Sequence, residues 1–193
     1  DSRLLIQDDG QVKIVSPQLL GRLHLNDPVP MGDEPSPALI SLPIQPPPRL
    51  LAVTMSGRVA LVRWEFAGQQ QGTLERFLPT ALEGDEVVSL LPLPNPEDLN
   101  ANETKSPGLL TSDGRFKRLP LNDIQELSGR AATVLKLKEG VSLKAALICQ
   151  DGADVVLISD IGRVLRLQAG ETNLPLMGKL AQGPITMRLL PGE

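Results

Sequence analysis

The chain has 193 residues, of which 41% are hydrophobic and 2% aromatic, and its formal net charge is −4. This size and apolar content are sufficient for one domain with a sizeable core. The single histidine and single cysteine exclude a disulfide within the chain and leave almost nothing for a zinc site or a Ser-His-Asp triad. No apolar stretch approaches the roughly 20 residues of a membrane span. The composition therefore predicts a cytoplasmic protein with no membrane partner, metal or cofactor.

A short pattern of apolar run, tight turn and second run occurs four times. It is clearest at 109–119, where Gly114 can adopt the positive φ that a hairpin turn requires. The same pattern surrounds Gly10, Gly57 and Gly162, and the four glycines are 47, 57 and 48 residues apart. Such a period is typical of propeller blades of about four strands rather than of helical solenoids. We therefore predict an all-β, propeller-like fold that forms a single repeat domain over 1–193.

Side chains of one kind recur at fixed distances from each turn glycine. The positions two and five residues after it are apolar and are expected to face the core: Val12, Val59, Phe116 and Val164, then Val15, Val62, Leu119 and Leu167. The position three residues before it is polar: Gln7, Thr54, Thr111 and Ser159. The position directly after it holds Gln11, Arg58, Arg115 or Arg163. These columns predict four hairpins in one register.

The predicted blades span about 1–49, 50–107, 108–153 and 154–193. A spacer with many prolines closes the first, and because proline cannot donate to a strand ladder it marks edges and connections. The second blade ends in a segment rich in Pro, Asn, Asp and Glu at 92–107, which we expect to be a surface loop.

The fourth repeat reaches Gly192 and Glu193, where the earlier repeats begin another strand, so the last blade is expected to be one strand short. An exposed sheet edge favours aggregation. We therefore expect either that the first and last repeats meet in a closed or nearly closed ring, or that a second copy covers the edge.

Basic side chains also recur on the expected surface. Arg58, Arg115 and Arg163 directly follow turn glycines, and Arg118 and Arg166 stand four residues after theirs. Further basic residues lie nearby: Lys13, Arg63, Lys117, Arg130, Lys136, Lys138, Lys179 and Arg188. They can be solubilising charges that also protect sheet edges, or they can form a surface for an acidic partner. The acidic net charge disfavours nucleic acid in bulk, but it does not locate the charges, so periodicity alone leaves both interpretations open.

The third and fourth repeats resemble a known family. Residues 111–121, followed by a Gly-Arg segment and by Leu137-Lys138-Glu139-Gly140, resemble a repeat of the C-terminal domain of the DNA gyrase A subunit or of its topoisomerase IV counterpart. Residues 156–166, with Gln182-Gly183 and Gly192-Glu193, resemble another such repeat. Residues 83–86 are similar to the family's closing Gly-Asp element. The resemblance covers all four repeats and is strongest in the last two.

The resemblance implies a β-pinwheel, a propeller-like ring usually of six blades in which a hairpin of one repeat packs into its neighbour. It also implies an accessory domain of a bacterial type II topoisomerase, associated with the nucleoid, whose basic rim binds and bends duplex DNA without sequence specificity. By matching position, the DNA-binding residues would be Arg58, Arg115, Lys117, Arg118, Arg130, Arg163, Arg166 and Lys179.

Two departures from the family qualify the function that the resemblance implies. The Gln-Arg-Arg-Gly-Gly-Lys-Gly-like box that full wrapping requires is absent, and 67–72 is at most a neutral relic of it. The chain contains no tyrosine, so it is not expected to be an enzyme by itself. The DNA-cleaving tyrosine would belong to the N-terminal catalytic part of the same subunit, which, together with an ATPase subunit, is the expected partner. The alternative is a propeller-like protein-interaction module that has lost DNA binding.

Overall fold

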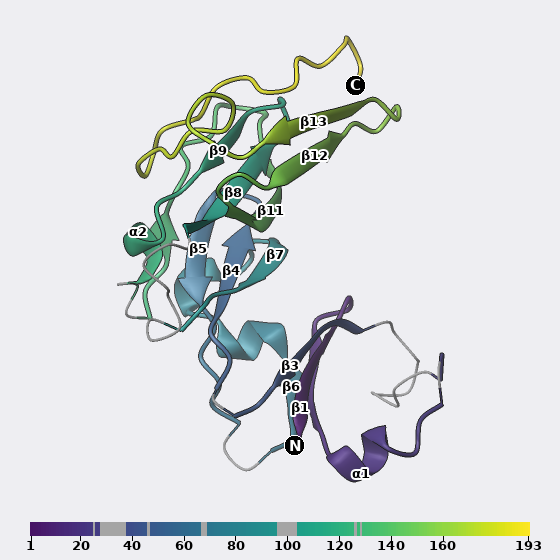
Figure 1. Ribbon diagram of the computed structural model, residues 1–193. Coiled ribbons are helices and arrows are strands. Elements are labelled where there is room, and N and C mark those ends of the chain that lie inside the picture. The colour runs from purple at the N-terminus through teal and green to yellow at the C-terminus, as the bar shows by residue number, and fades with distance from the viewer. Residues whose placement is uncertain are drawn as a thin grey trace.

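The computed structural model describes residues 1–24, 26–27, 38–45, 47–66, 69–95, 104–125, 127 and 129–193. Its strands form four separate antiparallel sheets, one for each predicted repeat, arranged along an arc (Figure 1). The helical segments are short turns in the connections: α1 (Pro17–Leu20), η1 (Leu74–Phe77), η2 (Thr80–Leu82) and α2 (Asn122–Gln125). The prediction of an all-β fold built from repeats is confirmed.

The first two sheets each contain four strands around one hairpin. The first has the order β3-β1-β2-β6 and the second the order β10-β5-β4-β7. The strands of the first are β1 (Arg3–Gln7), β2 (Gln11–Val15), β3 (Ala38–Pro43) and β6 (Gln71–Thr73). Those of the second are β4 (Leu50–Thr54), β5 (Arg58–Leu61), β7 (Val87–Pro92) and β10 (Ala132–Thr133).

The third and fourth sheets are smaller. The third has the order β11-β8-β9, and the fourth consists of the hairpin β12-β13 in the part of the chain that the structure describes. Their strands are β8 (Lys105–Thr111), β9 (Phe116–Arg118), β11 (Leu143–Gln150), β12 (Asp154–Ile158) and β13 (Val164–Gln168). The blades therefore decrease from four strands to two along the chain, and four strands are complete only in the first two.

A repeat contributes a strand to the sheet of the repeat before it. The second repeat donates β6 to the first sheet, where it pairs with β2, and the third repeat donates β10 to the second sheet, where it pairs with β5. The fourth repeat makes the equivalent contact through two isolated bridges, between Arg115 and Ile185 and between Arg118 and Leu176. Each of the first three hairpins is thus completed by a segment of the repeat that follows it.

The turn glycines fulfil the prediction of four hairpins. All four have a φ of 81° or 82°: Gly10, Gly57, Gly114 and Gly162. Space also requires glycine at two of them, because a Cβ on Gly57 would come within 2.6 Å of the Leu135 carbonyl oxygen, and one on Gly114 would overlap the Met187 carbonyl. In both cases the crowding segment belongs to the next repeat. Glycine therefore permits the turn and also lets the following repeat pack onto it.

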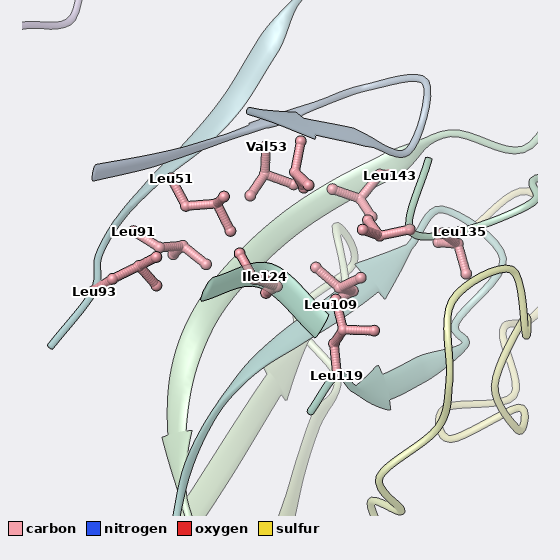
Figure 2. Packing of buried hydrophobic residues seen from close by; sticks show 11 residues of the cluster. Leu51, Val53, Leu91, Leu93, Leu109, Leu119, Ile124, Leu135 and Leu143 are labelled. Carbon is pink, nitrogen blue, oxygen red and sulfur yellow. The ribbon is translucent and has the colours of Figure 1, made fainter. Parts of the chain in front are cut away.

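Apolar clusters fill the spaces between neighbouring blades. In each of the first three hairpins, the residues six and four before the glycine and two after it face the next blade. In the second hairpin these are Leu51, Val53 and Val59, all 0% exposed, and they pack against Leu109 and Leu143 of the third blade (Figure 2). Truncating one buried leucine in such a core costs about 2 to 5 kcal/mol. The interblade clusters therefore hold the arc together.

Four sequence-based expectations need correction or restriction. Val164 is 64% exposed and not buried, because the described chain places no further blade against the outer side of β13. The predicted loop at 92–107 is shorter than expected, since Leu93 is buried and β8 begins at Lys105. Residues 96–103 of this loop lie outside the described residues. Residues 28–37, which make up most of the proline-rich spacer of the first blade, also lie outside them. The first blade and the C-terminal segment lie at opposite ends of the arc, so the described chain does not close a ring (Figure 1).

Candidate nucleic-acid interface

In the second, third and fourth repeats, the hydroxyl three residues before the turn glycine bonds the backbone of the arginine after it. Thr54 Oγ1 accepts from the Arg58 backbone N–H at 3.2 Å and donates to the Arg58 carbonyl at 3.1 Å. Thr111 makes the same two bonds with Arg115, at 3.1 and 3.2 Å. Both threonines are buried, so the bonds are shielded from water. These bonds fix the backbone of the arginine that was predicted to contact DNA.

The turn arginines of the second and fourth repeats bind the closing acidic residue of their own repeat. Arg58 Nη2 lies 2.9 Å from Asp85 Oδ2 and Nη1 donates to the Ala81 carbonyl at 2.6 Å. Arg163 Nη2 lies 2.7 Å from Glu193 Oε2. The hydrogen bond from Arg163 lowers the pKa of Glu193 to about 2. These arginines therefore stabilise the blade, and they keep 34% and 40% of their side-chain surface exposed.

Arg115 has a different partner because its repeat lacks the closing acid. Val141 follows Gly140 where the other repeats have Asp85 or Glu193. Arg115 instead pairs with Asp113 at 3.2 Å and donates to the Gly183 carbonyl of the fourth repeat at 2.8 Å. Its side chain is 21% exposed. Arg115 thus tethers the third turn to the next repeat.

Lys117 and Arg118 were expected on the rim, and this expectation is wrong because both are 1% exposed. Arg118 donates to the Leu174 carbonyl at 2.5 Å and pairs with Asp151 and Glu171. Lys117 Nζ donates to the Gly178 carbonyl at 2.9 Å, and burial lowers the pKa of this amine to about 8. Both side chains hold the 171–185 segment of the fourth repeat against β9 and cannot reach a DNA backbone.

The other three predicted residues are exposed. Arg166 is 71% exposed and pairs with Asp154 on the neighbouring strand β12. Arg130 and Lys179 lie at the surface in the connecting segments of the third and fourth repeats, and neither forms an ion pair with any described residue. Of the predicted cations near the turns, Lys117 and Arg118 are therefore buried, Arg58, Arg115 and Arg163 are partly exposed, and Arg166 is fully at the surface.

The connections supply cations at equivalent places on successive blades. The Val134 N–H donates to the Gly57 carbonyl at 3.0 Å, and the Thr186 N–H donates to the Gly114 carbonyl at 2.9 Å. Since the carbonyls of Leu135 and Met187 crowd the turn glycines of the preceding repeats in the same way, Lys136 and Arg188 occupy matching positions. Alignment on each repeat's own glycine conceals this match, because the connections differ in length.

Three cations from this region gather in one place. Arg115, Lys136 and Lys138 line a small hollow between the third turn and the connections, together with Asp113 and Gln182. Lys136 and Lys138 are exposed, and neither forms an ion pair within the described chain. The hollow therefore carries a local excess of positive charge.

Charge divides the chain along its length. Residues 1–107 contain 8 basic and 14 acidic side chains, a net −6, whereas 108–193 contain 11 basic and 9 acidic ones, a net +2. The junction of the first two blades is on the acidic side, since six carboxylates and one cation, Arg76, line its surface hollow: Asp8, Asp9, Glu75, Glu83, Asp85 and Glu86. Residues 108–193 are therefore basic although the net charge of the whole chain is negative.

We call seven cations of the second to fourth repeats the basic strip. Lys136 lies beside the turn at Gly57, Arg188 beside the turn at Gly114, and Arg115 contacts the Gly183 carbonyl. The basic strip consists of Arg58, Arg115, Arg130, Lys136, Lys138, Lys179 and Arg188.

Three other kinds of functional feature are absent among the described residues: a membrane-spanning helix, a metal cluster and an activated thiol. No helix among them is long and apolar enough to cross a membrane. Nor do three or more of their His, Cys, Asp or Glu side chains gather so as to hold a metal ion. Cys149 is buried, and burial raises the pKa of its thiol to about 11, so it is not an activated nucleophile.

Comparison with known proteins gives consistent results. Residues 109–150 and 153–193 each match the family described as DNA gyrase C-terminal domain, beta-propeller. The chain is 32% identical over 121 residues to the DNA gyrase A subunit of Granulibacter bethesdensis, covering 62% of this chain and 13% of that protein. It is 29% identical over 134 residues to the A subunit of DNA topoisomerase 4 from a Synechocystis species, covering 62% and 14%. The chain thus spans a small part of these relatives.

Solved structures confirm the fold. The chain superimposes on a DNA gyrase A C-terminal domain with a TM-score of 0.64 at 19% identity, covering 99% of this chain and 61% of that one. For a topoisomerase IV C-terminal domain the TM-score is 0.61 at 16% identity, with 100% and 60% covered. The resemblance seen in the sequence is confirmed: the chain has the β-pinwheel fold of the C-terminal domains of the DNA gyrase and topoisomerase IV A subunits, and its residues 109–150 and 153–193 are similar to that family's repeats.

Proposed function

We propose that the chain binds duplex DNA without sequence specificity through the basic strip, as an accessory domain within the A subunit of a bacterial type II topoisomerase. The observation that carries the proposal is the gathering of Arg115, Lys136 and Lys138 in one hollow on a chain that is acidic overall. A solvated lysine or arginine is a good partner for a phosphate oxygen, and contacts of this kind position a protein on DNA without reading bases.

The strip supports binding to a short stretch of DNA rather than full wrapping. Its cations lie on the second to fourth repeats, whereas acidic side chains surround the junction of the first two blades. Two of the originally expected contacts are buried. A duplex that follows the strip would leave the surface at the first blade, where Asp8, Asp9 and Glu75 would repel phosphate.

The parent enzyme would supply the chemistry. The chain has no tyrosine, so we propose that cleavage belongs to the N-terminal catalytic part of the same polypeptide, which works with an ATPase subunit. The role left to this domain is to hold a DNA segment near that catalytic part, in the bacterial cytoplasm on the nucleoid.

Fluorescence anisotropy with labelled duplexes of about 40 base pairs tests the proposal. Four to six phosphate contacts would give a slope of about −4 to −5 for log K against log salt, and scrambled duplexes should bind equally. Replacing Lys136 and Lys138 together by glutamine should weaken binding to every duplex. Arg22→Glu changes the net charge by the same amount at an exposed site in the first repeat, and it should have little effect.

Two results would overturn the proposal. One is the absence of binding at micromolar protein and low salt, about 50 mM, which would leave the protein-interaction module as the better interpretation. The other is an equal loss of affinity in the Arg22→Glu control and in the double lysine variant, which would show that total charge matters and the strip does not.

A further inference from the structure

An open groove lies between the first two blades, beside the edge strands β3 and β7. Its volume of about 1130 Å³ exceeds the roughly 300 to 1,000 Å³ of a typical small-molecule pocket. Its floor is apolar, since Ile40, Leu78, Val87 and Leu90 line it and are partly buried against the cluster between these blades. Leu39 also lines it and is 64% exposed. We call this space the junction groove, and its size suits a stretch of polypeptide.

The equivalent junction between the second and third blades is closed. The strands β3, β7 and β11 hold equivalent places, because each pairs with the first strand of the hairpin in its blade. The Ala146 N–H of β11 donates to Ser89 Oγ of β7 at 2.9 Å, and Val88, Ala146 and Ile148 pack on the cluster between those two blades. No hydrogen bond joins β3 to β7 among the residues that the structure describes. The fold can therefore close such a junction, whereas the first junction leaves apolar side chains accessible.

Both blades that border the junction groove belong to the described chain. A further blade of a longer polypeptide would stack on the outer face of the first or the last blade, and it would leave this junction as it is. The occupant of the groove is therefore not another repeat of the same kind.

Carboxylates surround the apolar floor. Six of them line the groove with one arginine, and three of the six are exposed and form no ion pair within the described part of the chain: Glu75, Glu83 and Glu86. Phosphate groups of a nucleic acid or of a lipid surface would be repelled here, whereas lysine and arginine side chains would be attracted. The groove therefore selects a ligand that is both apolar and cationic.

The chain itself does not supply such a ligand. The two longest segments outside the described residues, 28–37 and 96–103, contain two and three acidic residues and no lysine or arginine. A second copy would offer Lys136 and Lys138, but the leucine between them, Leu137, already packs against its own core. A second copy would thus bring charge without the apolar side chains that the floor requires.

We propose that the junction groove binds an extended segment of a partner protein in which apolar and basic side chains alternate. Alternate side chains of an extended segment point to opposite sides, so one set contacts Val87 and Leu90 on the floor and the other reaches Glu83 and Glu86. The inference goes beyond DNA binding and does not depend on it, because no residue of the basic strip takes part. The partner can therefore bind at the first blades while DNA lies along the later ones.

Isothermal titration calorimetry of the full chain with short synthetic peptides tests the proposal. A peptide in which lysine and leucine alternate should bind with micromolar affinity and a stoichiometry of one. Two peptides of the same length separate the contributions, because one keeps the lysines with serine in place of leucine and the other keeps the leucines with glutamate in place of lysine. Each should bind at least tenfold more weakly. Equal binding of the lysine–serine peptide overturns the proposal, since charge alone would then explain it.

Charge variants of the chain locate the site. Substituting Glu83 and Glu86 together by glutamine should weaken binding of the lysine–leucine peptide at least tenfold. Both side chains are exposed, so the variant should still fold, as circular dichroism would confirm. Glu139→Gln combined with Asp160→Asn is the matched control, because it removes two exposed charges from the third and fourth repeats, and it should leave the affinity unchanged.

Apolar variants test the second half of the recognition. Leu39→Ser should weaken binding of the lysine–leucine peptide, whereas Leu190→Ser, at a position 50% exposed in the fourth repeat, should not. Substituting Lys136 and Lys138 together by glutamine should weaken DNA binding and leave peptide binding unchanged, so that failure of one proposal is distinguishable from failure of the other.

Three results would overturn the proposal of a partner segment. The lysine–leucine peptide could fail to bind, or its affinity could be the same for the groove variants and for their controls. The third is self-association of the chain in sedimentation velocity that disappears in the double glutamine variant of the groove, which would make a second copy the occupant.

Discussion

Arg163 and Glu193 form an ion pair at 2.7 Å that ties the fourth hairpin turn to the closing loop of its repeat. Arg58 and Asp85 form the same pair at 2.9 Å in the second repeat. In both, a cation directly after the turn glycine meets an acid directly after the closing glycine, Gly84 or Gly192. The recurring arginine is therefore first a structural residue, and its remaining exposed surface is what DNA could use.

The Arg163–Glu193 pair should make stability depend on pH. Arg163 lowers the pKa of Glu193 from its usual 4.5 to about 2. As the pH falls, Glu193 is therefore protonated in the unfolded chain at a higher pH than in the folded chain, and this favours unfolding. The contribution of the pair is present above pH 4.5 and is lost as the pH falls to about 2. Thermal melts at pH 7, 4 and 3 should show this loss in the wild type. The Glu193→Gln variant should have a lower melting temperature at pH 7, and this temperature should depend less on pH than in the wild type. If the melting temperature of the variant changed with pH as much as that of the wild type, the Arg163–Glu193 pair would not be the cause.

Thr111→Val should destabilise the chain although it preserves shape and burial. The substitution removes both bonds to Arg115 and leaves a buried N–H unpaired, which costs about 1 to 3 kcal/mol. Urea unfolding measures the change in free energy. Thr111→Ser keeps the hydroxyl and should lose less than half as much, and a serine variant as unstable as the valine variant would indicate that packing of the methyl group matters more.

Lys117 should make the chain more stable in alkali over a limited range. Burial lowers its pKa from 10.5 to about 8, so burying the charged amine has a cost below pH 8 that disappears as the pH rises toward 10.5. The full effect is at most about 3 kcal/mol. Urea unfolding at pH 7 and pH 10 should show this gain in the wild type. Lys117→Met lacks the titrating group and should not show it, and a parallel gain in the variant would contradict the prediction.

The turns and most of the core could be predicted from the sequence because they depend on local constraints. A glycine with positive φ and apolar residues on one face specify a hairpin whatever surrounds it. The burial of Lys117 and Arg118 could not be predicted, since it results from the 171–185 segment, which reaches β9 from a distant part of the chain. Lys136 and Arg188 were missed as a pair because their match appears only when each is aligned on the preceding repeat's glycine.

Val59→Asp and Val164→Asp should differ sharply although the two valines share one column. Val59 is 0% exposed, and an unpaired charge there costs several kcal/mol against a total stability of about 5 to 15. Val164 is 64% exposed, so aspartate there should change the monomer's stability by no more than about 0.5 kcal/mol. Chemical unfolding at low concentration separates the two. An unfolded Val164→Asp monomer would show that this face is buried in the isolated chain.

The first blade junction should acquire affinity for DNA when its charge is reversed. The Leu74 N–H donates to the Gly10 carbonyl as Val134 donates to Gly57, so the connection of the second repeat lies where the third repeat carries the basic strip, and Arg76, which follows Glu75, matches Lys136. Glu75 is exposed on that connection. Glu75→Lys replaces repulsion by a phosphate contact, which would steepen the salt slope by about 0.9. Anisotropy titrations with 40-base-pair duplexes at several salt concentrations measure it.

The control for this gain must separate position from charge. Asp27→Lys makes the same change of two charges at an exposed site after α1, beside His24 and away from the junction. It should raise affinity only slightly and leave the slope unchanged, because a distant charge acts through the screened field and not through a released counterion. If both variants gain equally, DNA responds to the total charge. If only Glu75→Lys gains, the strip ends at the first blade because of its acids, and the fold itself would allow the strip to continue.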